Sequence, residues 1–199
     1  MRFPFSVLAV LVTLGCIPVE SFAQDSDTEA GFVKIFDGKT MKGWKLAEEN
    51  SDAWHVKDGQ LMCDGARCHL FYDGPLAPFE DFHFKADVMT TPGSNAGIYF
   101  HTKYQPEGWP KYGYECQVNV SHTDPKKTSS LYGVDNVSAE DLAVNDVKDN
   151  QWYTQEIIVK GRRIQLIVNG KTMVDYTEPE SKESFDKNFE RRLGKGTFA

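Results

Sequence analysis

The stretch Tyr153–Tyr176, YTQEIIVKGRRIQLIVNGKTMVDY, decides the fold class of this 199-residue chain. It contains three runs in which apolar and polar residues alternate, separated by Gly161-Arg162 and Asn169-Gly170. Alternation with a period of two places successive side chains on opposite faces of a strand, and Asn-Gly favours a tight hairpin turn. The stretch therefore predicts a meander of three antiparallel strands.

Shorter runs of the same kind lie on both sides of this meander. They predict strands at residues 54–57, 60–62, 82–89, 97–101 and 114–120, a short one at 32–36, and the opening of another at 195–199. Residues 121–150 are polar and lack a sustained period, so long surface loops are expected there, with at most a helical turn near 139–142. Many short strands without a convincing amphipathic helix predict an all-β antiparallel sandwich.

The composition indicates a globular protein that has little affinity for nucleic acid. Hydrophobic residues make up 40% and charged residues 26% of the chain, which is a globular balance. The 22 Lys and Arg residues face 29 Asp and Glu residues, so the formal charge is -7. Such a chain has no positive field that would gather phosphate backbones, and no nucleic-acid partner is expected.

The first residues have the pattern of an export signal. Residues 3–17 are almost wholly apolar, and Ser21-Phe22-Ala23 has the small-x-small form of a cleavage site. We expect a signal peptide at 1–23, a polar leader at 24–30, no membrane span, and a periplasmic or extracellular location. A lipoprotein signal at Leu14-Gly15-Cys16 is a weaker alternative.

Three cysteines remain after the expected cleavage. Cys63 and Cys68 flank a turn-forming sequence and can form a local disulfide in an oxidising compartment, whereas Cys116 is expected to be buried. These three cysteines lack a CxxC pair, which disfavours a zinc site.

Two neighbouring strands are each predicted to present one polar face. Along residues 94–101 and 114–120 the alternation places on that face Asn95, Gly97, Tyr99, His101, Glu115 and Gln117. An acid, a histidine, amides and a tyrosine suit the hydroxyl groups of a sugar, with Glu115 as the candidate catalytic acid or base and His101 as a candidate base or ligand. The simpler interpretation is an ordinary solvated face.

Other catalytic signatures are absent from the sequence. It contains no GxSxG, P-loop or GxGxxG motif, and it lacks the Glu-x-Asp-x-Glu run of sandwich-type β-glucanases. A retaining glucanase of that kind is therefore disfavoured.

A series of short motifs resembles the 3-keto-disaccharide hydrolase domain family. The opening GFVKIFDGKTMKGW at 31–44 is similar to the family's "LFNGKDLTGW". Further pieces follow in the same order at 54–59, 82–84, 93–98, 113–117, 131–133, 151–152 and 168–170. The resemblance implies a concanavalin-like β-sandwich of the jelly-roll type at 31–199.

The resemblance also implies an activity, the hydrolysis of a glycosidic bond in a sugar that carries a ketone at carbon 3. The ketone acidifies the C2–H bond, so a base can remove that proton, the glycosidic oxygen leaves, and water then adds back. Carried onto this sequence, Glu115 or His101 is the base. Substrate-binding positions are Asn95, Gly97, Tyr99, Gln117 and Tyr132. A divalent cation could polarise the ketone, but no spacing in the sequence identifies its ligands.

The sequence departs from the family in two places. His101 stands where many relatives carry Arg. Relatives also continue past the position of Ala199 with a "Gly-x-Ile-x-Leu-Gln-x-His" strand and a closing strand, so a C-terminally incomplete domain with an open sheet edge is expected. Two alternatives to an enzyme remain: a noncatalytic carbohydrate-binding or adhesion module, and a structural sandwich without a sugar site.

Overall fold

The computed structural model describes residues 29–180 and 189–199. The expected signal peptide at 1–23 and all but the last two residues of the expected leader at 24–30 lie outside the described residues. Glu29–Lys34 belongs to a separate unit, in which the backbone N–H of Phe32 donates to Glu29 O. The second unit is Ile35–Ala199.

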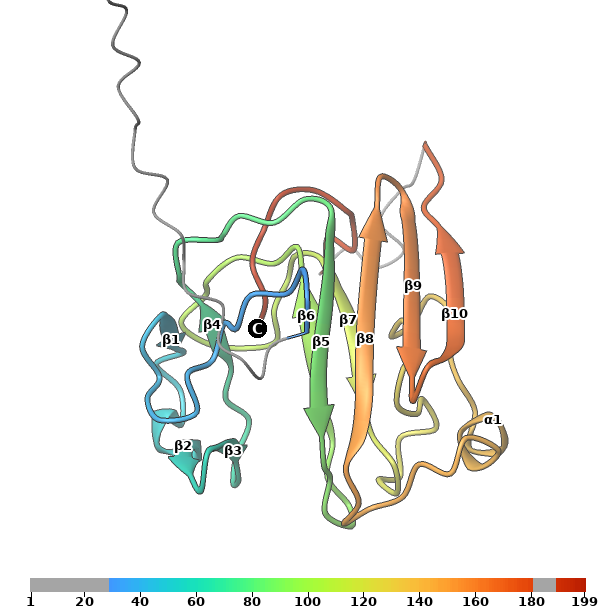
Figure 1. Ribbon diagram of the computed structural model, residues 1–199, viewed down its shortest axis with the longest axis horizontal. Coiled ribbons are helices and arrows are strands. Elements are labelled where there is room, and N and C mark those ends of the chain that lie inside the picture. Colours follow the sequence, from blue (N-terminus) through green and yellow to red (C-terminus); the bar gives the residue numbers. More distant parts are fainter. Residues whose placement is uncertain (1–28, 181–188) are drawn as a thin grey trace, which may run out of the picture. The chain divides into compact units, whose positions relative to one another are not determined.

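One sheet contains the meander that the sequence predicts. It is antiparallel with the order β10-β9-β8-β5, and the strands are β5 (Phe82–Val88), β8 (Tyr153–Lys160), β9 (Arg163–Val168) and β10 (Lys171–Thr177). Asn169 and Gly170 have φ angles of 48° and 77°, the left-handed values that a type I′ hairpin turn requires. Figure 1 shows these strands side by side.

The opposing layer is built around β6 (Ala96–Phe100) and β7 (Tyr114–Val118). Residues 130–132 extend it beyond β7, because Gln117 N donates to Ser130 O and Tyr132 N donates to Glu115 O, both at 3.0 Å. Residues 196–199 extend it beyond β6. The antiparallel pair β1 (Trp44–Leu46) and β4 (Leu70–Tyr72) lies on the opposite side of residues 196–199 from β6. Tyr72 N of β4 donates to Phe198 O at 2.9 Å.

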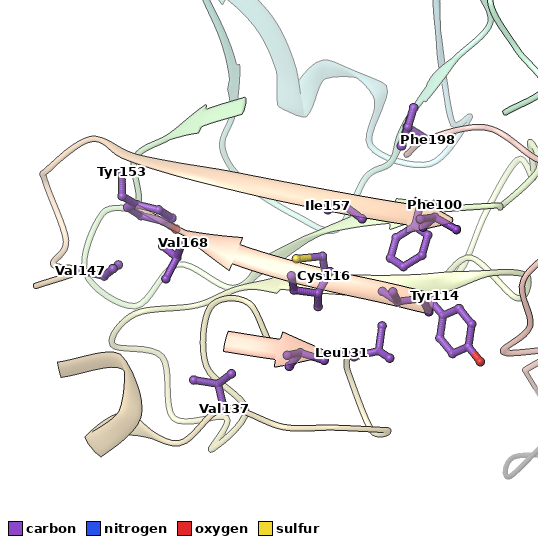
Figure 2. Close-up of a cluster of buried hydrophobic side chains, with 14 of the residues drawn as sticks. Phe100, Tyr114, Cys116, Leu131, Val137, Val147, Tyr153, Ile157, Val168 and Phe198 are labelled. Carbon is purple, nitrogen blue, oxygen red and sulfur yellow. The ribbon is translucent and has the colours of Figure 1, made fainter. Parts of the chain in front are cut away.

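The core lies between these layers. Fully buried side chains of the first sheet, such as Ile157 and Leu166, belong to the same cluster as Phe100, Tyr114 and Cys116 of β6 and β7. Figure 2 shows Cys116 and Phe100 among the aliphatic side chains of this cluster. The predicted all-β, concanavalin-like antiparallel sandwich is thereby confirmed, as is the burial of Cys116.

The remaining elements are short. They are the hairpin β2 (Trp54–Lys57) and β3 (Gln60–Cys63), a 3-10 turn at Ser51–Ala53, and α1 (Ala139–Ala143). Ser138 and Asp141 close a reciprocal capping box at the start of α1, where the sequence indicates a helical turn.

The local structure lacks one predicted strand, has two strands that were not predicted, and answers the open question of whether two cysteines pair. Residues 32–36 form no strand, whereas β1 and β4 are strands that the sequence pattern does not indicate. The cysteines that flank the turn at 64–67 form no disulfide: Cys63 is free and exposed, and Cys68 is free and buried.

Candidate functional site

The pairing of β6 with β7 brings the predicted polar residues together on one face. Tyr99 lies opposite Glu115, and Gly97 lies opposite Gln117 in the antiparallel register. The alternate positions point into the core, so the division of the two strands into an apolar and a polar face agrees with the sequence pattern. This face is covered rather than open, because Tyr99, Glu115 and Gln117 are all buried.

Glu115 is the buried carboxyl group at the centre of this face. Only 7% of its surface is exposed, and desolvation raises its pKa from 4.5 to about 7. A hydrogen bond with Tyr99 and the charge of Arg191 act against this shift. A carboxyl with a pKa near neutrality can take up and release a proton under ordinary conditions, as a general base requires.

Gly97 provides the space that the carboxylate of Glu115 occupies. A Cβ atom at position 97 would lie 2.2 Å from Glu115 Oε1 and 2.8 Å from its Cγ. Any larger residue would push this side chain away. The glycine is therefore a steric condition for the position of Glu115.

Two side-chain amides, those of Gln117 and Asn95, lie next to Glu115 on the polar face of β6 and β7. The amide of Gln117 lies 2.8 Å from Asn95 Oδ1, and its other end faces Glu115 Oε1 and Ala96 O. With both amides turned so that donors meet acceptors, Gln117 donates to Glu115 Oε1 at 3.3 Å and to Ala96 O at 3.0 Å. The Gln117 amide thus connects the Glu115 carboxylate to Asn95, the residue just before β6.

Tyr132 borders the cluster from the segment that extends the layer beyond β7. Its hydroxyl donates to Asp124 Oδ2 at 2.9 Å, and desolvation followed by this bond raises its pKa to about 12. The ammonium group of Lys126 lies 4.5 Å from the centre of the tyrosine ring. Asp124 and Lys126 come from a polar loop in which the sequence pattern singles out neither residue.

His101 does not join this group. Strand β6 ends at Phe100, and the φ angle of His101 is 54°, so the alternation that placed its side chain beside Tyr99 ends there. Its Nε2 lies 2.8 Å from Glu80 O, and its Nδ1 accepts from Gly194 N at 3.2 Å. Burial lowers the pKa of His101, and both ring nitrogens are engaged with backbone groups.

Arg191 is a charged neighbour of the site that the sequence pattern does not indicate. It is buried, donates to Pro110 O and Gly113 O at 3.0 and 3.3 Å, and lies with its guanidinium 5.5 Å from the centre of the Tyr99 ring. Its position depends on hydrogen bonds to residues 81 and 78 positions earlier in the chain, which a local periodicity cannot indicate.

His69 lies against Tyr99 and also against Trp109, so that the three rings form one aromatic group. The ring centre of His69 is 5.7 Å from that of Tyr99 and 5.6 Å from that of Trp109. The sequence pattern missed both residues, because His69 precedes a strand of three residues and Trp109 lies in a loop.

The described residues contain no group of three or more His, Cys, Asp and Glu side chains that could hold a metal ion. The donor set at the polar face, a single buried carboxylate with amides and tyrosines, does not fit a divalent-cation site. A cavity of about 360 Å³ lies elsewhere, between Lys45, Tyr104 and Lys195, and none of the predicted site residues lines it. Within the described part of the chain, no helix has the length and apolar character of a membrane span.

Comparison with protein families finds one match that covers most of the chain. Residues 31–199 match the family model of the 3-keto-alpha-glucoside-1,2-lyase-like domain. This match confirms the resemblance that the ordered motifs indicate. A search of curated proteins returns no match.

Solved structures share the fold at low sequence identity. A presumed glycosyl hydrolase from Parabacteroides distasonis is 18% identical with a TM-score of 0.64, over 82% of this chain and 83% of that one. A second such protein from the same organism is 20% identical with a TM-score of 0.49, over 67% and 72%. The carbohydrate-binding module CBM66 from Bacillus subtilis is 12% identical with a TM-score of 0.47, over 78% and 84%. The first of these supports the sandwich fold.

Proposed function

The chain belongs to the 3-keto-alpha-glucoside-1,2-lyase-like domain family, and on that premise we propose that it cleaves 3-keto-glycosides by base-assisted elimination. The observation that carries the proposal is Glu115, a single buried carboxyl group whose pKa lies near 7. Elimination next to a ketone needs one base, whereas ordinary glycoside hydrolysis needs two spaced carboxyl groups.

The proposed reaction begins at C2 of the oxidised sugar. Glu115 takes the C2 proton, and the electron pair of the C–H bond forms an enolate with the C3 ketone. The enolate collapses to a C1=C2 double bond as the C1–O bond breaks, and the glycosidic oxygen leaves with the proton that Glu115 took from C2. Addition of water, with OH to C1 and H to C2, then gives the free 3-keto sugar, so that elimination and hydration together amount to hydrolysis.

The neighbouring groups would orient the sugar and stabilise the developing negative charge. The exposed amide of Asn95 supplies a polar group beside the carboxylate, Gln117 holds the carboxylate in place through its own N–H groups, and Arg191 supplies positive charge from the side of Tyr99. The hydroxyl of Tyr132 already donates to Asp124, so it would accept a hydrogen bond from a sugar hydroxyl. We also propose that the protein acts outside the cytoplasm, on the pattern of residues 1–23.

The test is the Glu115→Gln variant, which keeps the shape of the side chain and removes the base. We expect kcat/KM on a 3-keto-glucoside to fall by about 100-fold or more. In the wild-type protein kcat/KM should rise with pH through about 7, because the base acts in its ionised form. Glu140→Gln, at an exposed carboxyl of α1, is the matched control and should leave turnover unchanged.

Two results would count against the proposed function. Unchanged turnover in Glu115→Gln would remove Glu115 as the base. Saturable binding of the 3-keto-glucoside by the wild-type protein without any released product would instead support the noncatalytic carbohydrate-binding module.

A further inference from the structure

We propose that Trp109 and His69 form the subsite that binds the leaving-group sugar of a 3-keto-disaccharide. This inference rests on the proposed function, because it assigns the second half of the substrate of that same site. Neither residue belongs to the polar face of β6 and β7. His69 lies against Tyr99, which borders Glu115, and Trp109 lies against His69.

Trp109 is a large aromatic side chain held partly in solvent, with 45% of its surface exposed. Its loop is tightly organised by Gln105, whose Nε2 donates to the carbonyl oxygens of Glu107, Gly108 and Trp109 at 2.8, 3.1 and 2.8 Å. Gln105 Oε1 also accepts from Lys111 N at 3.0 Å. An exposed indole on a loop of fixed conformation is a preorganised surface for stacking.

An ion pair holds the same loop from the side of β4. Arg67 donates to both carboxylate oxygens of Glu49 at 3.0 and 2.9 Å, and Glu49 Oε1 also accepts from Gly108 N at 2.9 Å. The guanidinium of Arg67 lies 5.1 Å from the centre of the Trp109 ring. The indole is thus fixed from two directions, while nearly half of its surface remains accessible.

His69 supplies a polar group whose hydrogen-bonding capacity the described residues leave unused. It is buried among Phe71, Tyr99 and Trp109, and its Nδ1 has no hydrogen-bond partner among the described residues. Burial lowers its pKa to about 4, so the ring is neutral at pH 7 and has one donor and one acceptor nitrogen. A buried polar atom without a partner is unfavourable. Because this nitrogen is shielded from solvent, a ligand hydroxyl would satisfy it by moving the neighbouring rings apart on binding.

The two residues together match the two kinds of surface that a pyranose presents. The C–H groups of a sugar ring pack on an aromatic side chain, and its hydroxyl groups need hydrogen-bond partners. Tyr99 joins this pair to Glu115, so a sugar on Trp109 lies on the continuation of the site where the C2 proton would be removed. A methyl leaving group has neither a ring face to pack on Trp109 nor a hydroxyl group to bond to His69.

The experiment compares two 3-keto-α-glucosides that differ only in the leaving group, a methyl glycoside and a disaccharide whose leaving group is glucose. In Trp109→Ala we expect kcat/KM to fall about tenfold for the disaccharide and to change less than about twofold for the methyl glycoside. Trp109→Phe should recover part of the loss. Trp152→Ala, which removes the other strongly exposed tryptophan of the described residues, is the matched control and should change neither value.

His69→Phe keeps an aromatic ring and removes the nitrogens. It should lower kcat/KM for the disaccharide about fivefold and leave the methyl glycoside unchanged. Equal losses on both substrates in Trp109→Ala, or no loss on either, would overturn the subsite.

Calorimetric titration separates this inference from the proposed function. If the wild-type protein cleaves neither compound, the elimination mechanism fails, but the affinities for both compounds still test the subsite. Tighter binding of the disaccharide than of the methyl glycoside, lost in Trp109→Ala and kept in Trp152→Ala, supports the subsite. Equal affinities for the two compounds, or binding of neither, overturn it.

Discussion

The carboxyl group of Glu115 has a pKa near 7 because Gly97, on the neighbouring strand, has no side chain to exclude it from its buried position. Glu115 reaches a buried position only over the backbone of Gly97, where a Cβ atom would lie 2.2 Å from its Oε1. Burial then raises the pKa, and the amide of Gln117 and the ring of Tyr99 confine the carboxylate. The Asn95-Ala96-Gly97 sequence thus specifies the geometry of a residue on the neighbouring strand.

Substitution of Gly97 by alanine should therefore affect activity more than folding. The Cβ atom displaces the end of a flexible side chain, which shifts the proposed base out of position, and a misplacement of about 1 Å costs about 100-fold in rate. We expect a loss of kcat/KM of that order in a folded protein. Gly194→Ala is the control, because a Cβ atom there meets nothing within 4 Å. Full activity in Gly97→Ala would contradict this account of the site.

At the scale of elements, the segment 196–199 joins two parts of the second layer. Thr197 exchanges backbone hydrogen bonds with Thr102, and Ala199 exchanges them with Tyr99. On the other side Phe198 O accepts from Tyr72 N. The expected opening of a strand at 195–199 is thus found as extended backbone paired on both sides. Its position beside Tyr99 makes it a direct support of the strand that carries the candidate site.

Phe198 anchors this segment in the core. Its ring lies 4.7 Å from Phe79, 4.9 Å from Phe82 and 4.7 Å from Phe84, between centres, and it is buried. Phe198→Ala should lower the free energy of unfolding by about 3–5 kcal/mol in urea denaturation. Val144→Ala, at a side chain that is 73% exposed, should change it by less than about 0.5 kcal/mol. Equal values for the two variants would show that the segment does not stabilise the fold.

In the molecule as a whole, two buried titratable groups act on stability in opposite directions. The pKa of Glu115 rises from 4.5 to about 7 on folding, so the folded state holds its proton more tightly and stability falls as the pH rises between these values. The pKa of His69 falls from 6.5 to about 4, so the unfolded state binds the proton more tightly and stability rises as the pH rises between 4 and 6.5. Between pH 4.5 and 6.5 the two contributions oppose each other.

Single variants should expose each contribution. Relative to the wild-type protein, Glu115→Gln should gain stability progressively as the pH rises from about 4.5 to 7, by up to about 3 kcal/mol. His69→Phe should gain stability as the pH falls from about 6.5 to 4. Urea unfolding of the three proteins at pH 4, 5.5 and 8 measures both trends. A stability difference that does not vary with pH would mean that the side chain titrates alike in the folded and unfolded states.

The sequence by itself determined the fold class and the residues of the site that lie on β6 and β7. The meander at 153–176 and the polar face shared by Gly97, Tyr99, Glu115 and Gln117 follow from a period of two and from turn chemistry, which are properties of neighbouring residues. The three-residue strands β1 and β4 carry too few positions for a period, and all of β4 is buried, so no alternation marks it.

Only the tertiary structure decided which residues surround Glu115 and which predicted neighbour lies elsewhere. A positive φ angle turns His101 away at the end of β6, toward backbone groups of residues 80 and 194. Arg191 and His69 approach Tyr99 from segments far apart in the chain, and Trp109 packs against His69. The pKa of Glu115 is likewise a property of burial, because desolvation depends on every segment that excludes water from the carboxylate and on no local pattern.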